Sequence, residues 1–223
     1  MPDELLDRLR RFHNDAFPQY REQFQNLVDE GQHPTTLFIG CSDSRLVPYL
    51  LTGAGPGELF LVRNVGAFVP PYDGSHGHHG TSAAIEFAVR GLEVEHVVIL
   101  GHALCGGIAA LVDGRDSVFA SFDYLSTWTS VARETRDVVV REMAGRPRAE
   151  IVRAVEQAAV VNSVKNLMGF PWLAERVAAG KLVLHAWWFN LTEGQLYAFR
   201  PDTATFEPVH VLQLEPAVSR DTR

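Results

Sequence analysis

The chain has 223 residues, of which 46% are hydrophobic, and its 27 acidic and 20 basic residues give a formal net charge of −7. This length fits one domain with a sizeable core. A nucleic-acid-binding protein would carry a basic stripe, and this chain has no long single-sign block, so we expect no nucleic-acid partner. We expect a single domain over residues 1–223, with a helical arm at 1–31 and a loose tail at 215–223.

The N-terminus and the cysteine count bear on the compartment. The first seven residues are acidic and lack the basic and apolar regions of a signal peptide. No apolar run is long enough to span a membrane, so we expect a cytoplasmic protein without a membrane partner. Two cysteines cannot build a disulfide framework, and in an intracellular enzyme they indicate metal ligands or a redox pair.

The first predicted elements form the helical arm. Leu5, Leu9 and Phe12 recur at helical spacing and predict a helix over residues 3–13. The pattern then repeats and ends near Gly31, which predicts a second helix. These helices carry more apolar surface than so small an element can hide alone. We therefore expect the arm to pack on the main body or on a partner subunit.

The rest of the chain alternates strands and helices. Continuous apolar strands are predicted at 36–40, 59–65, 96–101 and 182–189. Helices are predicted at 82–92, from 106 onward, and at 124–143, 149–168 and 171–179. The segment 195–199 is predicted to pair back as an antiparallel edge strand. The predicted fold class is therefore α/β, with a mostly parallel central sheet of about four parallel strands plus an antiparallel edge strand, flanked by helices.

Both cysteines stand in short polar motifs directly after predicted strands. Cys41 opens the motif Cys41-Ser42-Asp43-Ser44-Arg45, and Cys105 closes His102-Ala103-Leu104-Cys105. Open α/β sheets place ligand sites at the carboxyl ends of strands, so the two motifs meet if their strands are neighbours. Two thiolates and one imidazole supply three of the four ligands of a tetrahedral zinc, and an open fourth position is typical of catalytic sites.

Asp43 and Arg45 are spaced for an ion pair beside that site. They stand two positions apart, which allows a bidentate pair on a loop. Zinc makes hydroxide available near neutral pH, and Asp43 would accept a hydrogen bond from the zinc-bound hydroxide. If Arg45 turned away, Asp43 would become a fourth metal ligand and close the site. The alternative role for the pair is a loop-stabilising salt bridge, worth about 0–1 kcal/mol.

At this point the sequence resembles the β-class carbonic anhydrases. The two cysteine motifs, the second continuing into Gly106 and Gly107, carry the resemblance together with four further blocks. Those blocks are residues 56–64, 69–73, 80–86 and 184–188. The similarity extends over about residues 5–209. The resemblance implies reversible hydration of carbon dioxide to bicarbonate and a proton.

The resemblance also implies roles for individual residues. One zinc per chain would sit on Cys41, His102 and Cys105, with Asp43 and Arg45 as the catalytic pair. The implied substrate-binding residues are Gln32, Phe60, Val65, Phe87 and Gly106. Family members build this site at a dimer interface, so we expect a homodimer at least, often pairing into a tetramer or larger assembly, with the arm embracing the partner.

Three positions depart from related sites. Phe38 stands where bacterial members with a closed, bicarbonate-inhibited state carry a tryptophan, which together with Gln32 favours the open, plant-like state. Phe87 replaces a tyrosine that is common in plant-like sites. Gly91 replaces a histidine proposed to shuttle protons, so the proton shuttle stays unassigned.

Two other functions stay open at this point. The same site would serve a hydrolase acting on carbonyl sulfide or carbon disulfide. A non-catalytic zinc or bicarbonate-responsive module is the second alternative, and the Asp43–Arg45 pair argues against it because a structural zinc site closes with a fourth protein ligand.

Overall fold

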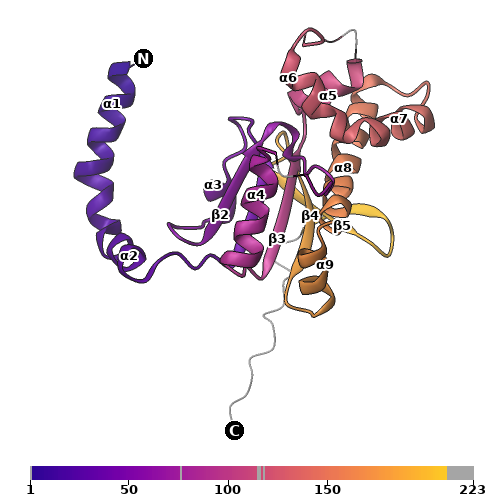
Figure 1. Ribbon diagram of the computed structural model, residues 1–223. Coiled ribbons are helices and arrows are strands. Elements are labelled where there is room, and N and C mark those ends of the chain that lie inside the picture. The colour runs from indigo at the N-terminus through magenta and orange to yellow at the C-terminus, as the bar shows by residue number, and fades with distance from the viewer. Residues whose placement is uncertain (1, 76, 115–116, 118, 210–223) are drawn as a thin grey trace.

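The computed structural model describes residues 2–75, 77–114, 117 and 119–209 (Figure 1). The strands are β1 (Thr36–Cys41), β2 (Leu59–Asn64), β3 (His96–His102), β4 (Val183–Asn190), β5 (Gln195–Arg200) and β6 (Thr205–Pro208). The helices are α1 (Pro2–Arg11), α2 (Phe17–Glu30), α3 (Pro48–Thr52), α4 (Gly80–Glu86), α5 (Gly106–Asp113), α6 (Asp123–Thr129), α7 (Arg133–Glu142), α8 (Arg148–Leu167) and α9 (Pro171–Ala178). The tail expected at 215–223 lies outside the described residues.

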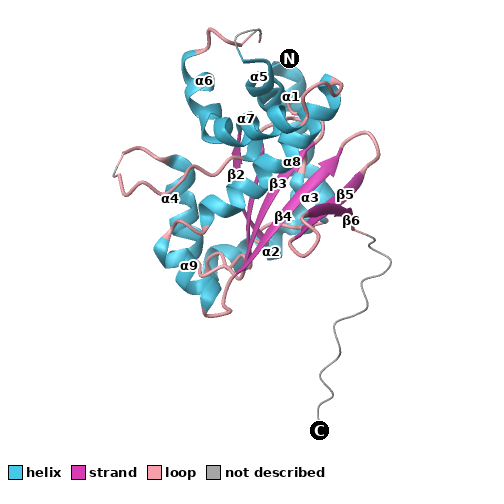
Figure 2. Ribbon diagram, turned by 90° about the vertical axis from the view of Figure 1, so that its right-hand side faces the viewer, coloured by secondary structure: helices cyan, strands magenta, loops and turns pink. Residues whose placement is uncertain are grey.

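The strands form one sheet in the order β2-β1-β3-β4-β5-β6. The first four run parallel, and β5 pairs antiparallel with β4. The predicted α/β fold is therefore confirmed. β6, which was not predicted, adds a second antiparallel strand to the outer edge of the sheet (Figure 2).

The central strands are buried because the long helix α8 packs directly on β3 and β4. The approach is so close at Gly101 that a Cβ there would overlap the side chain of Val160. The β3 core residues from Val97 to Leu100 are almost fully buried, as a central parallel strand requires. This packing holds the carboxyl end of β3 rigidly against α8.

Two predicted helices are interrupted in the structure. The helix expected at 82–92 is α4 followed by a π-helical turn, Phe87–Gly91. The helix expected at 124–143 is divided by a short 3-10 turn, Ser130–Ala132, into α6 and α7. The hydroxyl of Thr129 donates to the Leu125 carbonyl at 2.9 Å, and such side-chain bonds to the preceding turn bend helices.

The N-terminal arm, α1 and α2, extends away from the sheet (Figure 1). Gln23 of α2 donates to the Pro56 carbonyl at 2.9 Å, and Leu27 lies against Gly57, which ties the second helix to the loop before β2. No described residue of α1 or α2 whose burial is given is buried, and Leu5 is 61% exposed. Within one chain the apolar stripe of the arm, formed by Leu5, Leu9 and Phe12, therefore stays exposed. Among the described helices, none combines the length and the apolar character needed to cross a membrane.

Candidate metal centre

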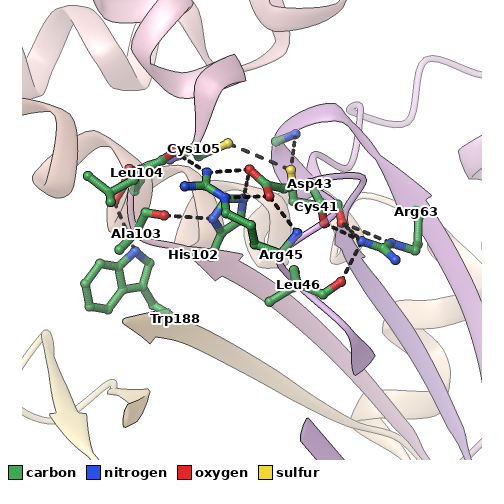
Figure 3. Close-up of polar contacts among 12 residues, drawn as sticks. Cys41, Asp43, Arg45, Leu46, Arg63, His102, Ala103, Leu104, Cys105 and Trp188 are labelled. Carbon is green, nitrogen blue, oxygen red and sulfur yellow. Dashed lines mark hydrogen bonds and ion pairs between the residues drawn. The ribbon is translucent and has the colours of Figure 1, made fainter. Parts of the chain in front are cut away.

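The two cysteine motifs meet at the carboxyl ends of two adjacent strands. Cys41 is the last residue of β1, His102 is the last of β3, and Cys105 follows three residues later. The sulfur atoms of Cys41 and Cys105 lie 3.8 Å apart (Figure 3). All three potential ligand atoms lie within 4.8 Å of one another, and all three residues are buried. The expectation that β1 and β3 are neighbours is confirmed.

The donor set fits zinc. Two sulfurs at about 2.3 Å from a tetrahedral zinc lie about 3.8 Å from each other, which is the separation seen here. The Nδ1–H of His102 donates a hydrogen bond to the Ala103 carbonyl at 2.8 Å. The buried Nε2 of the same ring has no hydrogen-bond partner. A free imidazole nitrogen facing two thiols is the arrangement that a bound cation would satisfy.

The electrostatics of the cysteine pair also favour a cation. A hydrogen bond from the Cys105 thiol, opposed by burial, lowers the pKa of Cys41 to about 4. The same contact raises the pKa of Cys105, because the proton of the pair stays there. Burial acts to lower the pKa of His102, but attraction to the Cys41 thiolate outweighs it, so this pKa is raised. The environment thus favours the thiolate form of Cys41, which is the form that binds a metal.

Asp43 and Arg45 form a bidentate pair on the loop after β1. The Arg45 Nε donates to Asp43 Oδ1 at 2.9 Å, and its Nη2 donates to Oδ2 at 2.7 Å. These hydrogen bonds hold the pKa of the Asp43 carboxyl well below its usual range. Asp43 Oδ2 lies 3.8 Å from His102 Nε2. An ionised carboxylate therefore lies beside the cluster, and its short hydrogen bonds are to Arg45.

Arg63 anchors the loop that carries this pair, through contacts that local sequence patterns do not indicate. Its guanidinium lies at 2.9 Å from the Cys41 carbonyl and at 2.7 Å from both the Asp43 and the Leu46 carbonyls (Figure 3). One side chain of β2 thus satisfies three carbonyls of the loop. The loop geometry beside the cluster depends on this side chain.

The turn between His102 and Cys105 is held from behind by α8. Leu104 adopts a left-handed backbone conformation with φ of 60°, which is uncommon for a residue with a branched side chain. Glu156 of α8 accepts a hydrogen bond from the Cys105 N–H at 3.0 Å. Burial raises the pKa of the Glu156 carboxyl. No local sequence pattern marks Glu156, because its contact with Cys105 spans 51 residues.

The predicted substrate-binding residues fall into two groups. Val65 and Gly106 lie beside the cluster, since the neighbouring Gly66 N–H donates to the Cys41 sulfur at 3.4 Å and Gly106 directly follows Cys105. Phe60 and Phe87 form a separate pair with ring centroids 5.7 Å apart, near the amino end of β2.

Gln32 lies apart from its own chain's cluster. It is exposed and precedes the amino end of β1, whereas Cys41 ends that strand. The fold of one chain therefore does not bring Gln32, Phe60 or Phe87 to the cluster.

The fold and this cluster together define an α/β protein with a two-cysteine, one-histidine metal centre at the carboxyl edge of a parallel sheet. The family model described as "Carbonic anhydrase" matches residues 36–196. Carbonic anhydrase 1 of Escherichia coli O157:H7 is 35% identical over 209 residues, covering 92% of this chain and 91% of that protein. The carbonic anhydrase of Synechococcus elongatus is 34% identical over 193 residues, covering 86% and 70%.

Solved structures agree with the family match. The β-carbonic anhydrase CcaA superposes with a TM-score of 0.86 at 30% identity, covering 93% of this chain and 98% of that one. A tetrameric β-carbonic anhydrase of Sordaria macrospora gives 0.76 at 32% identity, covering 88% and 95%. The chain belongs to the carbonic anhydrase family, and to its β class.

Proposed function

We propose that this chain catalyses the reversible hydration of carbon dioxide to bicarbonate and a proton at a zinc held by Cys41, His102 and Cys105. Family membership supports the reaction, and one observation supports the site. That observation is the bidentate Asp43–Arg45 pair, which keeps a carboxylate beside the cluster without making it a fourth ligand. We propose one zinc per chain, because the described residues offer one cluster of this kind.

Zinc bound here would supply a Lewis acid that provides a nucleophile from water near neutral pH. The role we assign to Asp43 is to accept a hydrogen bond at Oδ2, the oxygen that lies 3.8 Å from His102 Nε2. A fixed acceptor at this point orients the nucleophile toward the carbon of the substrate. Arg45 keeps Asp43 ionised and fixes the direction of its oxygens.

The surroundings of the cluster suit a small apolar substrate and an anionic product. Val65 places an apolar side chain beside the cluster, and carbon dioxide has no charge to be solvated. Gly106 begins α5, whose first N–H groups favour negative charge. We assign Val65 to the substrate side of the pocket and the Gly106 backbone to the bicarbonate product.

Gln32, Phe60 and Phe87 are proposed to act on the cluster of a second copy of the chain. They lie away from the cluster of their own chain. Gln32 and Phe87 are exposed and the adjoining Phe60 is half-buried, so this group is open to a neighbour. The uncovered apolar stripe of the arm supports a homodimer, because Leu5 and Leu9 would be solvated in a lone chain. The Sordaria macrospora relatives are described as tetrameric, and we propose a dimer or a pair of dimers here.

We propose that residues 1–223 act as one domain with its arm, in a reducing compartment such as the cytoplasm. The reason is chemical: both cysteines are free thiols, and they must stay reduced to hold a metal.

The first experiment is stopped-flow carbon dioxide hydration on protein of measured zinc content. Wild-type protein should turn over with about one zinc per chain. Asp43→Ala and Arg45→Ala should retain zinc and lose most of the turnover. Arg146→Ala, which removes another exposed ion pair, with Glu150, is the matched control and should behave as wild type. Wild-type rates in both site variants would refute the role of the pair.

The sulfur analogues provide the second assay. The cluster alone does not distinguish carbon dioxide from carbonyl sulfide or carbon disulfide, because the ligands at the metal need not differ. Hydrogen sulfide release from either compound, with no hydration of carbon dioxide at full zinc content, would replace the proposed reaction. Absence of all three activities would favour a non-catalytic zinc or bicarbonate-responsive role.

A further inference from the structure

Glu156 is a carboxylate in an otherwise apolar environment. It lies in the middle of α8 and is only 3% exposed, and its helix neighbours Val155, Ala159 and Val160 are buried core residues. Burying a carboxylate is costly unless hydrogen bonds satisfy it. Hydrogen bonds to Glu156 are therefore needed to offset the cost of its burial.

Two donors from different elements converge on this carboxylate. The backbone N–H of Cys105 donates to Oε1 at 3.0 Å, and the indole N–H of Trp188 in β4 donates to Oε2 at 3.3 Å. An ionised carboxylate has two acceptor oxygens and no donor, so it matches this pair of donors. An amide at the same place would have to turn an N–H toward one of them.

The contact with Cys105 falls on a turn that needs support. Leu104, directly before Cys105, has φ of 60°, a conformation that costs an ordinary residue free energy and persists only where the surroundings enforce it. Cys105 is the N-cap residue of α5, and the first N–H groups at a helix start have no partner inside the helix. Glu156 satisfies one of these groups with a negative charge, which the helix start favours.

The position of this turn is transmitted to the catalytic pair. The Leu104 carbonyl accepts a hydrogen bond from Arg45 Nη2 at 3.0 Å, and the same nitrogen holds Asp43 Oδ2 at 2.7 Å (Figure 3). A displacement of the turn would therefore move the Cys105 sulfur and the guanidinium together. The contacts form one path from Glu156 through the turn and Arg45 to Asp43.

We propose that Glu156 is a positioning residue of the metal centre: its carboxylate fixes the Leu104–Cys105 turn, and thereby both the Cys105 sulfur and the Asp43–Arg45 pair. Trp188 donates to the other carboxylate oxygen, and the Cys105 contact does not depend on it. This inference rests on the proposed role of Cys105 as a zinc ligand. Glu156 acts on the geometry of the site and has no contact with substrate.

The test compares zinc retention in three variants of the zinc-loaded full chain. Glu156→Gln keeps the size of the side chain but faces two donors with one acceptor. We expect zinc affinity to fall about 10- to 100-fold, the usual effect of losing a partner of a metal ligand, and zinc release to a chelator to accelerate accordingly. Trp188→Phe leaves the Cys105 contact intact and should release zinc at close to the wild-type rate, even if it melts earlier.

The double variant Glu156→Gln with Trp188→Phe provides the rescue. With the indole donor gone, the glutamine oxygen can turn to the Cys105 N–H without an opposing donor, so zinc release should slow again relative to Glu156→Gln alone. Cobalt-substituted protein gives a second readout. The sulfur-to-cobalt absorption should shift in Glu156→Gln and keep its wild-type position in Trp188→Phe.

Two results would overturn the proposal. One is wild-type zinc release with an unchanged cobalt spectrum in Glu156→Gln. The other is equal acceleration in Glu156→Gln and Trp188→Phe, which would assign Glu156 to general core packing. Cys105→Ser separates this inference from the proposed function: full zinc content in that variant would refute the ligand assignment itself, whatever Glu156 does.

Discussion

Replacing Gly107 with alanine should destabilise the protein through one clash beside the metal centre. A Cβ at this position would lie 2.5 Å from Cγ1 of Val65. The other near atoms, the Gly66 nitrogen at 3.7 Å and the Cys105 sulfur at 3.9 Å, are at ordinary contact distances. The whole effect therefore falls on Val65.

The size of the effect follows from how firmly Val65 is held. Carbon atoms pack at about 3.5–4.0 Å, so the new contact is about 1 Å too short. The Val65 carbonyl accepts a hydrogen bond from the Trp128 indole at 2.7 Å, and the next residue, Gly66, donates to the Cys41 sulfur. The backbone therefore cannot withdraw without losing these contacts. Overpacking of this kind costs about 1–3 kcal/mol, of which better helix propensity returns about 0.5–1 kcal/mol.

Urea denaturation of the zinc-loaded protein, at one fixed protein concentration, measures this free energy of unfolding. Gly106→Ala is the matched control, because a Cβ there meets nothing within 4 Å. That variant should be neutral or slightly stabilising. Gly107→Ala combined with Val65→Ala should recover roughly 1–2 kcal/mol relative to the sum of the single variants, as expected for residues in direct contact.

Additive effects of Gly107→Ala and Val65→Ala would refute this explanation, since a shared clash must produce coupling. Equal destabilisation by Gly106→Ala and Gly107→Ala would also refute it. Either result would mean that close packing on Val65 is not the cause of the destabilisation.

Three further predictions concern the same region. Leu104→Asn should raise the free energy of unfolding by about 1 kcal/mol, because asparagine tolerates the left-handed backbone and the lost side chain is 63% exposed; an unchanged or lower melting temperature would contradict this. Arg45→Ala should lower the free energy of unfolding by about 1 kcal/mol near pH 6. Urea denaturation near pH 3 should show a smaller loss of stability. The sign follows from the lowered pKa of Asp43: its ionised form stabilises the fold above the unfolded pKa, and this contribution is lost as the pH falls. A loss of stability that does not vary with pH would contradict this role of the ion pair. Chelated protein exposed to an oxidant should lose the thiols of both Cys41 and Cys105, because their sulfurs lie 3.8 Å apart and need only a small movement to form a disulfide. Zinc-loaded protein should keep both thiols, as measured by thiol titration. Equal loss from the two forms would argue against the metal site.

The strands that carry the site were predictable because their signals are local and strong. β1 and β3 are continuous apolar runs, and each is followed at once by polar residues with recognisable chemistry. β6 was missed because Thr205–Pro208 is short, mostly exposed and includes a proline, so its pairing with β5 is visible only in the folded sheet. The break between α6 and α7 was missed for a similar reason, because hydroxyl bonds to the helix backbone leave no mark on apolar periodicity.

The supporting contacts of the site were beyond local patterns. Arg63 stands 22 residues from Cys41, and Glu156 stands 51 residues from Cys105. Neither spacing has a sequence signature, because the contacts depend on β2 lying beside the loop after β1 and on α8 lying against the Cys105 turn. Gln32 is separated from the cluster by the length of β1, because Gln32 precedes the amino end of this strand and Cys41 ends it.

The sequence by itself determined the chemistry of this protein: two thiols, an imidazole and a carboxylate–guanidinium pair, each within a few residues of a strand end. Local spacing was sufficient for that, because Asp43 and Arg45 can meet across two residues without help from the fold. Only the tertiary structure decided that the two motifs form one cluster, since this depends on β1 lying next to β3. It also decided what holds the cluster in place, because the close packing of α8 on the sheet brings Glu156 to the Cys105 turn.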